Sequence, residues 1–318
     1  MAMISRLILV LTGSLLMWGC SHKDIDCPGS AVRTLDILYE WDNASGANPE
    51  GMTLYFFSTG AGSRVWRFDV SGSEGGRIEL PYGGYRLVTF NNDLPGVRIE
   101  GTESFSSIDA VARKVSASAS GAIGSTGMLY GSVVKDIYVS CRGVRYLDSQ
   151  GQTKECGRGL IRCRPDSLAV RYTAVFENSG GLEGVRSSYV LLHGPGLSLI
   201  FSDGHSEGFG SPLYIPLVLA RQAGHMEGSA AAFSPARLPD GLSGMTFVFT
   251  RNDGKSFSKE ISLTPENLNI ISPHNVVIHI EDFDIPDSGD NPPGDVGGID
   301  VDVEGWQSVE IVVEPTIA

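Results

Sequence analysis

The 318-residue sequence predicts an all-β protein in which two tandem antiparallel β-sandwich domains follow an N-terminal signal peptide. Its 40 glycines separate short runs of alternating apolar and polar residues, the pattern of strands with one buried face. No stretch of 12 residues shows a convincing helical period, so helices should be few and short. Removing residues 1–19 leaves 299 residues (318 minus 19), enough for two domains of about 150 residues each.

Residues 1–19 have the pattern of an export signal. Arg6 supplies a positive charge, and Leu7 to Leu16 form an apolar stretch that is shorter than the about 20 residues needed to span a bilayer. Met17-Trp18-Gly19-Cys20 then resembles the lipobox of bacterial lipoproteins, so Cys20 is predicted to be lipidated. Several acyl chains on Cys20 would hold the protein firmly on a membrane. The alternative is ordinary cleavage near Gly19, which leaves Cys20 as a free or disulfide-bonded thiol.

Residues 20–30 form the predicted lipidated tether. Its charged Ser21-His22-Lys23-Asp24-Ile25-Asp26 is similar to the tags that send Bacteroidetes lipoproteins to the outer face of the outer membrane. The expected location is therefore the outer membrane, lipid-anchored and facing the cell exterior. The net charge of −13 becomes −14 once Arg6 is removed, and the chain has no basic stripe for phosphate backbones. Nucleic acid is therefore not an expected partner.

Residues 31–135 are predicted to form the N-terminal β-sandwich. Leu35, Ile37, Tyr39 and Trp41 fall on one face of its first strand. Residues 52–57 are a nearly continuous apolar run, which suits a central strand, and alternation predicts further strands near 66–70, 78–80 and 85–90. The Ser-, Ala- and Gly-rich stretch 104–127 is expected to be a long surface loop.

Residues 136–286 are predicted to form the C-terminal β-sandwich. Its strands are expected within the ranges 169–176, 189–192, 197–201, 214–219, 246–250, 257–261 and 276–280. Short connections and the absence of helical periodicity favour antiparallel pairing.

A hydrophilic spacer at residues 287–298 precedes a C-terminal strand segment at residues 299–318. The apolar residues that alternate with acidic ones in this segment are Ile299, Val301, Val303, Val309, Ile311 and Val313. Two interpretations stay open. The strand closes a sheet of its own domain, or it pairs with another subunit by strand addition, which would also protect an apolar edge.

Five cysteines occur in the chain. With Cys20 lipidated, the other four permit three disulfide connectivities, and export through an oxidising compartment favours bond formation. Cys141, Cys156 and Cys163 crowd into one stretch, so a local bridge among them is expected, with Cys27 unpaired. They lack C-x-x-C spacing, and no metal site is predicted there.

Several segments together resemble Bacteroidales lipoproteins of the fimbrillin and minor-fimbrium-anchor group. The similarity lies in Cys20 to Asp24, Leu38 to Trp41, Met52 to Phe57, Pro81 to Asn92 and Trp306 to Val309. It implies two transthyretin-like β-sandwich domains and a role in anchoring or assembling surface fimbriae, with shaft or other pilin-like subunits as partners. None of these motifs is a catalytic signature.

Motifs that suggest other chemistry are better explained by structure. Gly204 to Gly208 matches the G-x-S-x-G pattern of hydrolases around Ser206, and Asp240 and His274 follow in the order of that fold. The motif runs through Phe209 to Pro212 straight into another strand where a hydrolase has a helix, so a hairpin is predicted and no catalytic residue is assigned.

Two further binding hypotheses concern calcium and glycans. The aspartates between 284 and 302 could offer oxygen ligands, but their spacing departs from an EF-hand loop, so neither a metal nor any other cofactor is predicted. The alternative function is that of a surface glycan-binding lipoprotein. Its stacking platform would be formed by Trp41, Trp66, Tyr82, Tyr85 and Trp306, although aromatic residues at alternating strand positions are more often core residues.

Overall fold

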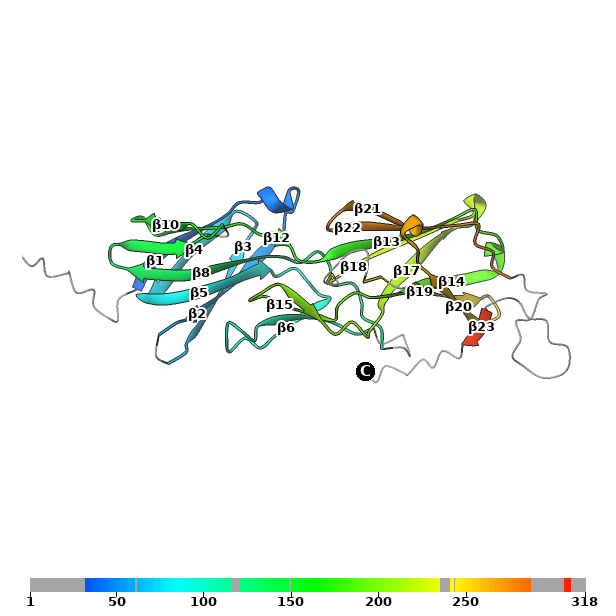
Figure 1. Cartoon of the computed structure of the whole chain (residues 1–318), viewed down its shortest axis with the longest axis horizontal. Coiled ribbons are helices and arrows are strands. Elements are labelled where there is room, and N and C mark those ends of the chain that lie inside the picture. The colour runs from blue at the N-terminus through cyan, green and yellow to red at the C-terminus, as the bar shows by residue number, and fades with distance from the viewer. Residues whose placement is uncertain are drawn as a thin grey trace, which may run out of the picture.

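The computed structural model describes residues 32–60, 62–115, 121–148, 150–234, 241–242 and 244–286, and the backbone of 306–309. The described chain is built almost entirely of strands, and Figure 1 shows them arranged along an elongated molecule. Its helices are the single-turn 3-10 segments η1 (Asp42–Ala44), η2 (Leu182–Gly184), η3 (Arg221–Ala223) and η4 (Pro265–Asn267). The predicted all-β class is confirmed. None of the helices in the described ranges is long and apolar enough to cross a membrane.

The N-terminal sandwich packs a seven-stranded sheet against a three-stranded one. The larger sheet contains β2 (Gly51–Ser58), β3 (Val65–Ser71), β5 (Gly83–Asn91), β8 (Tyr130–Ser140), β9 (Gly143–Leu147), β10 (Thr153–Cys156) and β12 (Asp166–Ser167). The smaller sheet contains β1 (Val32–Tyr39), β4 (Gly75–Pro81) and β11 (Leu160–Cys163), with β11 parallel to β1. Leu35 and Ile37 of β1 face Leu54 and Phe56 of β2 within one buried cluster. The alternation in these strands therefore gives one apolar face to this core.

The C-terminal sandwich is a nine-stranded sheet that turns back on itself. Its order is β21 (Leu268–Ser272), β22 (Asn275–Glu281), β13 (Val170–Glu177), β18 (His225–Ala232), β17 (Leu213–Ala220), β14 (Val185–His193), β19 (Gly244–Arg251), β20 (Ser256–Ser262) and β23 (Trp306–Val309). The turn lies in β17, which pairs with β14 over 213–217 and with β18 over 218–220. Phe176 of β13 and Phe247 of β19 meet across the two halves with ring centroids 5.2 Å apart.

A four-stranded sheet links the two sandwiches. It pairs β6 (Val97–Glu100) and β7 (Asp109–Ala112) with β15 (Ser198–Ile200) and β16 (His205–Glu207) from the other half of the chain. Phe90 of β5 stacks on Phe201, which follows β15, with centroids 4.9 Å apart. Residues 52–57 are therefore covered on both faces, because Tyr55 and Phe57 point into the core that continues towards the second sandwich.

Two sequence-based boundaries differ from the structure. The predicted domain boundary after residue 135 falls inside β8, which pairs with β5 from Val139 to Gly131, and the strands up to Ser167 stay with the first sandwich. The predicted surface loop at 104–127 is wrong at Asp109–Ala112, which form β7, and at Ile108, Ala110 and Ile123, which are fully buried. The partner of β7 is β15, almost 90 residues further along the chain, which local composition does not reveal.

Candidate functional site

The C-terminal sheet finishes with β20 and the short β23, and the side of β20 that faces β23 is the candidate assembly site. β23 pairs with β20 in antiparallel register, with Trp306 opposite Lys259 and Val309 opposite Ser256. On its other side β20 pairs with β19 along its full length to Ser262. Glu260, Ile261 and Ser262 therefore have a strand partner on one side only within the described part of the chain. This leaves main-chain groups at the edge that a further strand could bind.

Of the six apolar residues predicted to form the C-terminal strand, Val309 lies in β23. The other five lie outside the described residues: Ile299, Val301, Val303, Ile311 and Val313. The observed pairing of β23 with β20 corresponds to the interpretation in which the strand closes its own sheet. Pairing with another subunit stays a prediction.

Arg251 holds Pro286 against the C-terminal sandwich. Its Nη2 donates a hydrogen bond of 2.6 Å to the carbonyl oxygen of Pro286. Its guanidinium lies 4.8 Å from the ring centroid of Phe257 on β20, and the side chain is only 5 % exposed. Lys259 of β20 lies 5.6 Å from the ring of Phe283 in the same exit segment. The segment that leads to the spacer therefore leaves beside β20.

Sequence reasoning did not find this role of Arg251. The available signal is a lone arginine that follows the largely apolar, uncharged run Met245 to Thr250. Because a buried charge is costly unless it is paired or hydrogen-bonded, such an arginine indicates a specific partner.

The predicted lipidation site, Cys20, lies outside the described residues, which begin at the start of β1. Arg33 shows where the tether would join the fold. Its Nη1 donates to the carbonyl oxygens of Ser140 and Cys141, and its Nη2 donates to that of Gly157. The chain therefore enters the first sandwich between the β8–β9 turn and the turn that follows β10.

The expected local disulfide does not form. Cys156 and Cys163 keep free thiols, whereas Cys141 is disulfide-bonded, so its partner is neither of them. Crowding in sequence misled the prediction because Cys163 points into the sandwich core, where burial raises the pKa of its thiol to about 12. Cys156 is half-buried, and backbone N–H groups of Leu160, Arg158 and Gly159 lower the pKa of its thiol.

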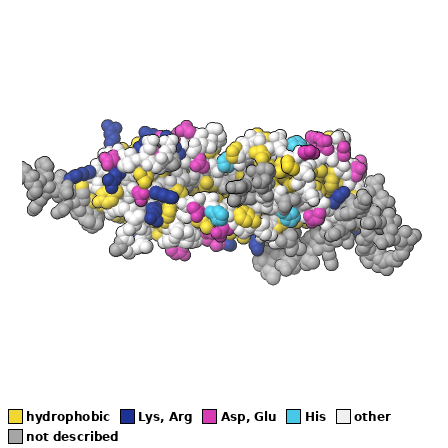
Figure 2. Space-filling model, in the orientation of Figure 1, with side chains coloured by type: hydrophobic (Ala, Val, Ile, Leu, Met, Phe, Trp, Pro, Cys, Tyr) yellow, Lys and Arg dark blue, Asp and Glu magenta, His cyan; other side chains and the backbone are white. Residues whose placement is uncertain are grey.

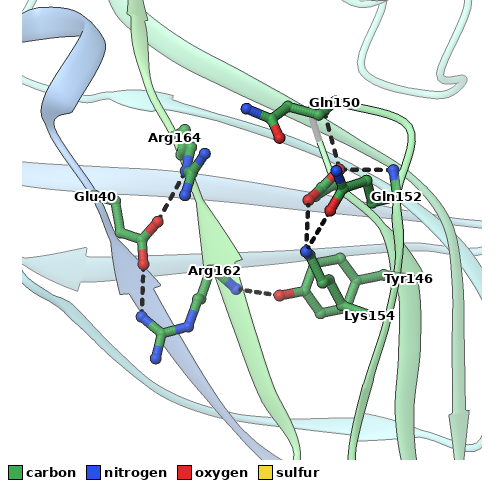
Figure 3. Close-up of polar contacts among 8 residues, drawn as sticks. Glu40, Tyr146, Gln150, Gln152, Lys154, Arg162 and Arg164 are labelled. Atoms are coloured by element: carbon green, nitrogen blue, oxygen red, sulfur yellow. Dashed lines mark hydrogen bonds and ion pairs between the residues drawn. The ribbon is translucent and has the colours of Figure 1, made fainter.

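A polar network ties β11 to the rest of the first sandwich (Figure 3). Glu40 accepts hydrogen bonds from Arg162 Nη1 at 2.5 Å and Arg164 Nε at 2.8 Å, and these arginines hold the pKa of its carboxyl below the usual range. Asp148 accepts N–H bonds from the backbone of Gln150 and Gln152, and it pairs with Lys154 at 3.3 Å. These charged side chains therefore bond one another and the backbone, and they hold the segments around β11 and the β9–β10 turn in place.

Two cavities open around the β15–β16 hairpin, and the first of them lies beside this network. Asp148, Arg164 and Asp203 line the first, of about 470 Å³. Ser206, His205 and His274 line the second, of about 620 Å³. Within the described ranges, no group of three or more His, Cys, Asp or Glu is placed to hold a metal ion.

The residues of the hydrolase-like motif do not form a nucleophile elbow. Ser206 lies in the middle of β16, is buried, and pairs with Leu199 of β15. An elbow needs a turn from a strand into a helix, and here the hairpin continues as strands. His274 lines the same cavity as Ser206, while Asp240 lies outside the described residues.

The aromatic residues considered for glycan stacking serve mainly as packing residues. Trp66 meets Tyr85 edge to face at 5.3 Å, and Tyr85 is 2 % exposed. Trp41 packs edge to face on Tyr130 at 5.8 Å, and its Nε1 donates a hydrogen bond to the carbonyl oxygen of Ser73. The side chain of Trp306 lies outside the described residues. Tyr85 lies in the first core and Trp41, Trp66 and Tyr82 are packed partly buried against it, so these four rings are accounted for by packing.

Comparison with known proteins assigns the family. The model of a family described as "Domain of unknown function (DUF5119)" matches residues 19–207, more than half of the chain. The chain belongs to the DUF5119 family.

This DUF5119 protein is also similar to a curated relative and to solved structures. It is 39 % identical over 106 residues to the "Putative fimbrium anchoring subunit Fim4B" of Bacteroides ovatus, a match that covers 32 % of this chain and 30 % of the relative. The crystal structure of a "putative adhesin" from Bacteroides ovatus ATCC 8483 aligns with a TM-score of 0.61 at 20 % identity, over 86 % of this chain and 99 % of that one. The fimbrial anchor protein Mfa2 from Porphyromonas gingivalis aligns with a TM-score of 0.47 at 12 % identity, over 79 % and 91 % of the two chains.

The resemblance to Bacteroidales fimbrial-anchor proteins that the sequence indicated is thus confirmed. The adhesin structure shares the overall fold with this chain. The curated relative is matched over less than a third of its length, so its printed role describes that protein.

Proposed function

We propose that this DUF5119 protein is a non-enzymatic, lipid-anchored protein of the outer-membrane surface that anchors or helps to assemble a fimbria. It would do so by pairing a β-strand with a pilin-like subunit. The curated relative named as a fimbrium anchoring subunit and the motifs shared with that group support the proposal.

The edge of β20 is the observation that carries the proposal. In the part of the chain that the structure describes, four residues of this edge, Ser256 to Lys259, pair with β23, and Arg251 binds Pro286 close to β20. Strand addition uses main-chain hydrogen bonds, and alternate side chains provide specificity. A partner strand could therefore extend the pairing over Glu260 to Ser262, or could replace β23 along the whole edge.

The proposed function also requires attachment to the membrane through a lipid on Cys20. One acyl chain gives marginal membrane binding, whereas two or more hold a protein stably. An anchor needs such a hold, because the fimbria it carries would otherwise pull it from the surface. Radioactive palmitate should label the wild-type protein in cells and should not label the Cys20→Ala variant.

Site-specific crosslinking in intact cells tests the strand-pairing proposal. A photoreactive amino acid at the exposed Glu260 of β20 would face any strand added to this edge. The matched control is the same group at the exposed Asp69 of β3, the edge strand of the first sandwich. We expect mass spectrometry to find pilin-like subunits crosslinked to position 260 and not to position 69.

Two outcomes would count against it. Crosslinks from position 260 that remain within the chain would show that β20 does not receive a partner strand. Equal capture of the same subunit from position 69 would show contact without edge specificity.

A further inference from the structure

Cys141 has a disulfide partner that the described part of the chain does not contain. Cys141 is disulfide-bonded, whereas Cys156 and Cys163 keep free thiols. The chain has five cysteines, so the partner is Cys20 or Cys27, both of which lie outside the described residues. Either bond would fasten the predicted tether to the first sandwich.

The place of Cys141 in the fold suits such a bond. Cys141 belongs to the two-residue turn between β8 and β9, and it is half-buried. Arg33, near the start of β1, reaches this turn. Its Nη1 donates hydrogen bonds of 3.2 Å to the carbonyl oxygen of Ser140 and of 2.9 Å to that of Cys141. The chain that precedes β1 therefore joins the fold next to Cys141.

The charge around this turn favours formation of a disulfide. Figure 2 shows Lys and Arg side chains gathered over the part of the molecule that Figure 1 assigns to the first sandwich. Residues 141–164, which run from the turn through β9, β10 and β11, hold six Lys or Arg and two Asp or Glu. Positive charge stabilises the thiolate, which is the form that attacks a disulfide. Two thiols then pass two protons and two electrons to a donor disulfide of the exported oxidoreductase class, which becomes a dithiol.

The length of the chain and the proposed lipid both favour Cys27 over Cys20. A disulfide brings two Cα atoms within about 7 Å of each other. The six positions from Cys27 to Arg33 span at most about 21 Å, enough to reach the turn that Arg33 contacts. Closing the thirteen positions from Cys20 would be about threefold less favourable. A sulfur that carries lipid cannot also form a disulfide, so the choice of Cys27 also rests on the proposed lipid anchor.

We propose that Cys27 and Cys141 form a disulfide that clamps the lipid tether to the β8–β9 turn. A pull on the tether would otherwise act on β1, which is held by hydrogen bonds to β4 and β11. Through the disulfide the pull acts on β8 and β9, which lie inside the larger sheet. Residues 28–140 are then part of a covalently closed loop that the pull does not extend. Crowding in sequence predicts an unpaired Cys27, and this bond would correct that prediction.

Peptide mapping without reduction identifies the partner of Cys141. The full-length protein is purified from cells that export it, its free thiols are alkylated, and trypsin is added. Cleavage after Lys and Arg places Cys20, Cys27 and Cys141 in three separate peptides, 20–23, 24–33 and 136–142. We expect peptide 24–33 to be linked to peptide 136–142. A link from 20–23 to 136–142, or alkylation of Cys27, overturns the proposal.

Force spectroscopy tests the clamp itself. In magnetic tweezers the mature full-length chain with Cys20→Ser is held by its two ends, so no lipid is needed. The disulfide removes the 114 positions from Cys27 to Cys141 (141 minus 27) from the extensible chain, about 400 Å of contour length. The test variant adds Cys27→Ser/Cys141→Ser to this parent. The matched control adds Cys156→Ser, which removes a free thiol.

We expect the parent and the control to unfold to a contour length about 400 Å shorter than that of the test variant. A reducing agent should add the same length to the parent, which checks the clamp without substituting its cysteines. Circular dichroism confirms that the variants are folded before they are pulled. Equal contour lengths for parent and test variant overturn the proposal. A bond between Cys27 and Cys141 in a protein that palmitate does not label would overturn the lipid anchor alone.

Discussion

Replacing Arg251 by methionine should loosen the exit of the C-terminal segment and destabilise the second sandwich. The arginine is 5 % exposed, donates a 2.6 Å hydrogen bond to the Pro286 carbonyl, and lies 4.8 Å from the ring of Phe257. A hydrogen bond from a charged group contributes about 1.5–3 kcal/mol, and a desolvated cation–π contact contributes up to about 2 kcal/mol. Methionine fills a similar volume and recovers about 1 kcal/mol through its contact with the aromatic ring. The expected net loss is about 3 kcal/mol.

Urea unfolding followed by circular dichroism measures this loss as a shift of the midpoint at unchanged slope. Arg186→Met is the matched control, because Arg186 lies exposed on β14 of the same sheet. Hydrogen exchange should also accelerate at the amide of Ile285, which donates to the carbonyl oxygen of Gly180 in the exit segment. If the free energies of unfolding of Arg251→Met and Arg186→Met differ by less than about 0.5 kcal/mol, the gain from removing a costly buried charge offsets the lost contacts. That result would refute the reasoning.

Three further predictions concern the described fold. Glu40→Gln should lower the free energy of unfolding by about 1 kcal/mol at neutral pH, which is the range of exposed ion pairs. This loss should vanish in acid, because the folded pKa of Glu40 lies below its unfolded value. Iodoacetamide should alkylate Cys156 in the native protein at a lower pH than it alkylates a free cysteine, while Cys163 reacts only after unfolding. Gly181→Ala should lower the free energy of unfolding by about 2 kcal/mol or more, because φ is +71° at this position and a Cβ would collide with the carbonyl oxygen of Ile285.

Each of these predictions has its own control. The effect of Glu40→Gln is followed by urea unfolding at several pH values, and a cost that persists in strong acid would contradict the ion-pair explanation. Mass spectrometry of alkylated peptides compares the two thiols, and modification of Cys163 in the native state would contradict its burial. Gly184→Ala is the reference for Gly181→Ala, since a Cβ at Gly184 would meet no atom within 4 Å. Equal midpoints for the two glycine variants would show that position 181 relaxes without cost.

Strands with strict alternation could be predicted from the sequence because each buries one face in a core that lies nearby. Leu35, Ile37 and Tyr39 all lie in the first core, as their spacing indicated. The apolar run at 52–57 was correctly predicted to be a central strand, since it pairs with β3 and β5 and is covered on both faces.

The linking sheet could not be predicted, because its stability comes from partners distant in sequence. β7 has the sequence Asp-Ala-Val-Ala, and its small residues become core only when β15 pairs with it and Phe201 stacks on Phe90. Tertiary packing of this kind overrides local composition. The cysteines show the same effect, since Cys163 lies only seven positions after Cys156 in sequence but belongs to a different sheet.

The start of β1, where the tether joins, and the β20 edge lie at opposite ends of the described fold. β1 begins at one end of the elongated molecule, whereas β20 and β23 lie at the other (Figure 1). Charge follows the same axis: residues 32–167 hold fifteen Lys or Arg and fifteen Asp or Glu, while residues 168–318 hold seven and twenty. A protein lipidated at Cys20 could therefore present β20 away from the membrane.

This arrangement makes the contacts between the two sandwiches the path for a load between the two ends. Among the described residues, these contacts include the junction of β7 with β15, the bridge of Ile123 to Leu213 and the stack of Phe90 on Phe201, together with the chain connection after Ser167. Phe90 and Phe201 are each 4 % exposed, so the load crosses a packed core, which resists separation better than a flexible linker does. A fimbrial anchor needs this property, and a protein that binds only small soluble ligands does not.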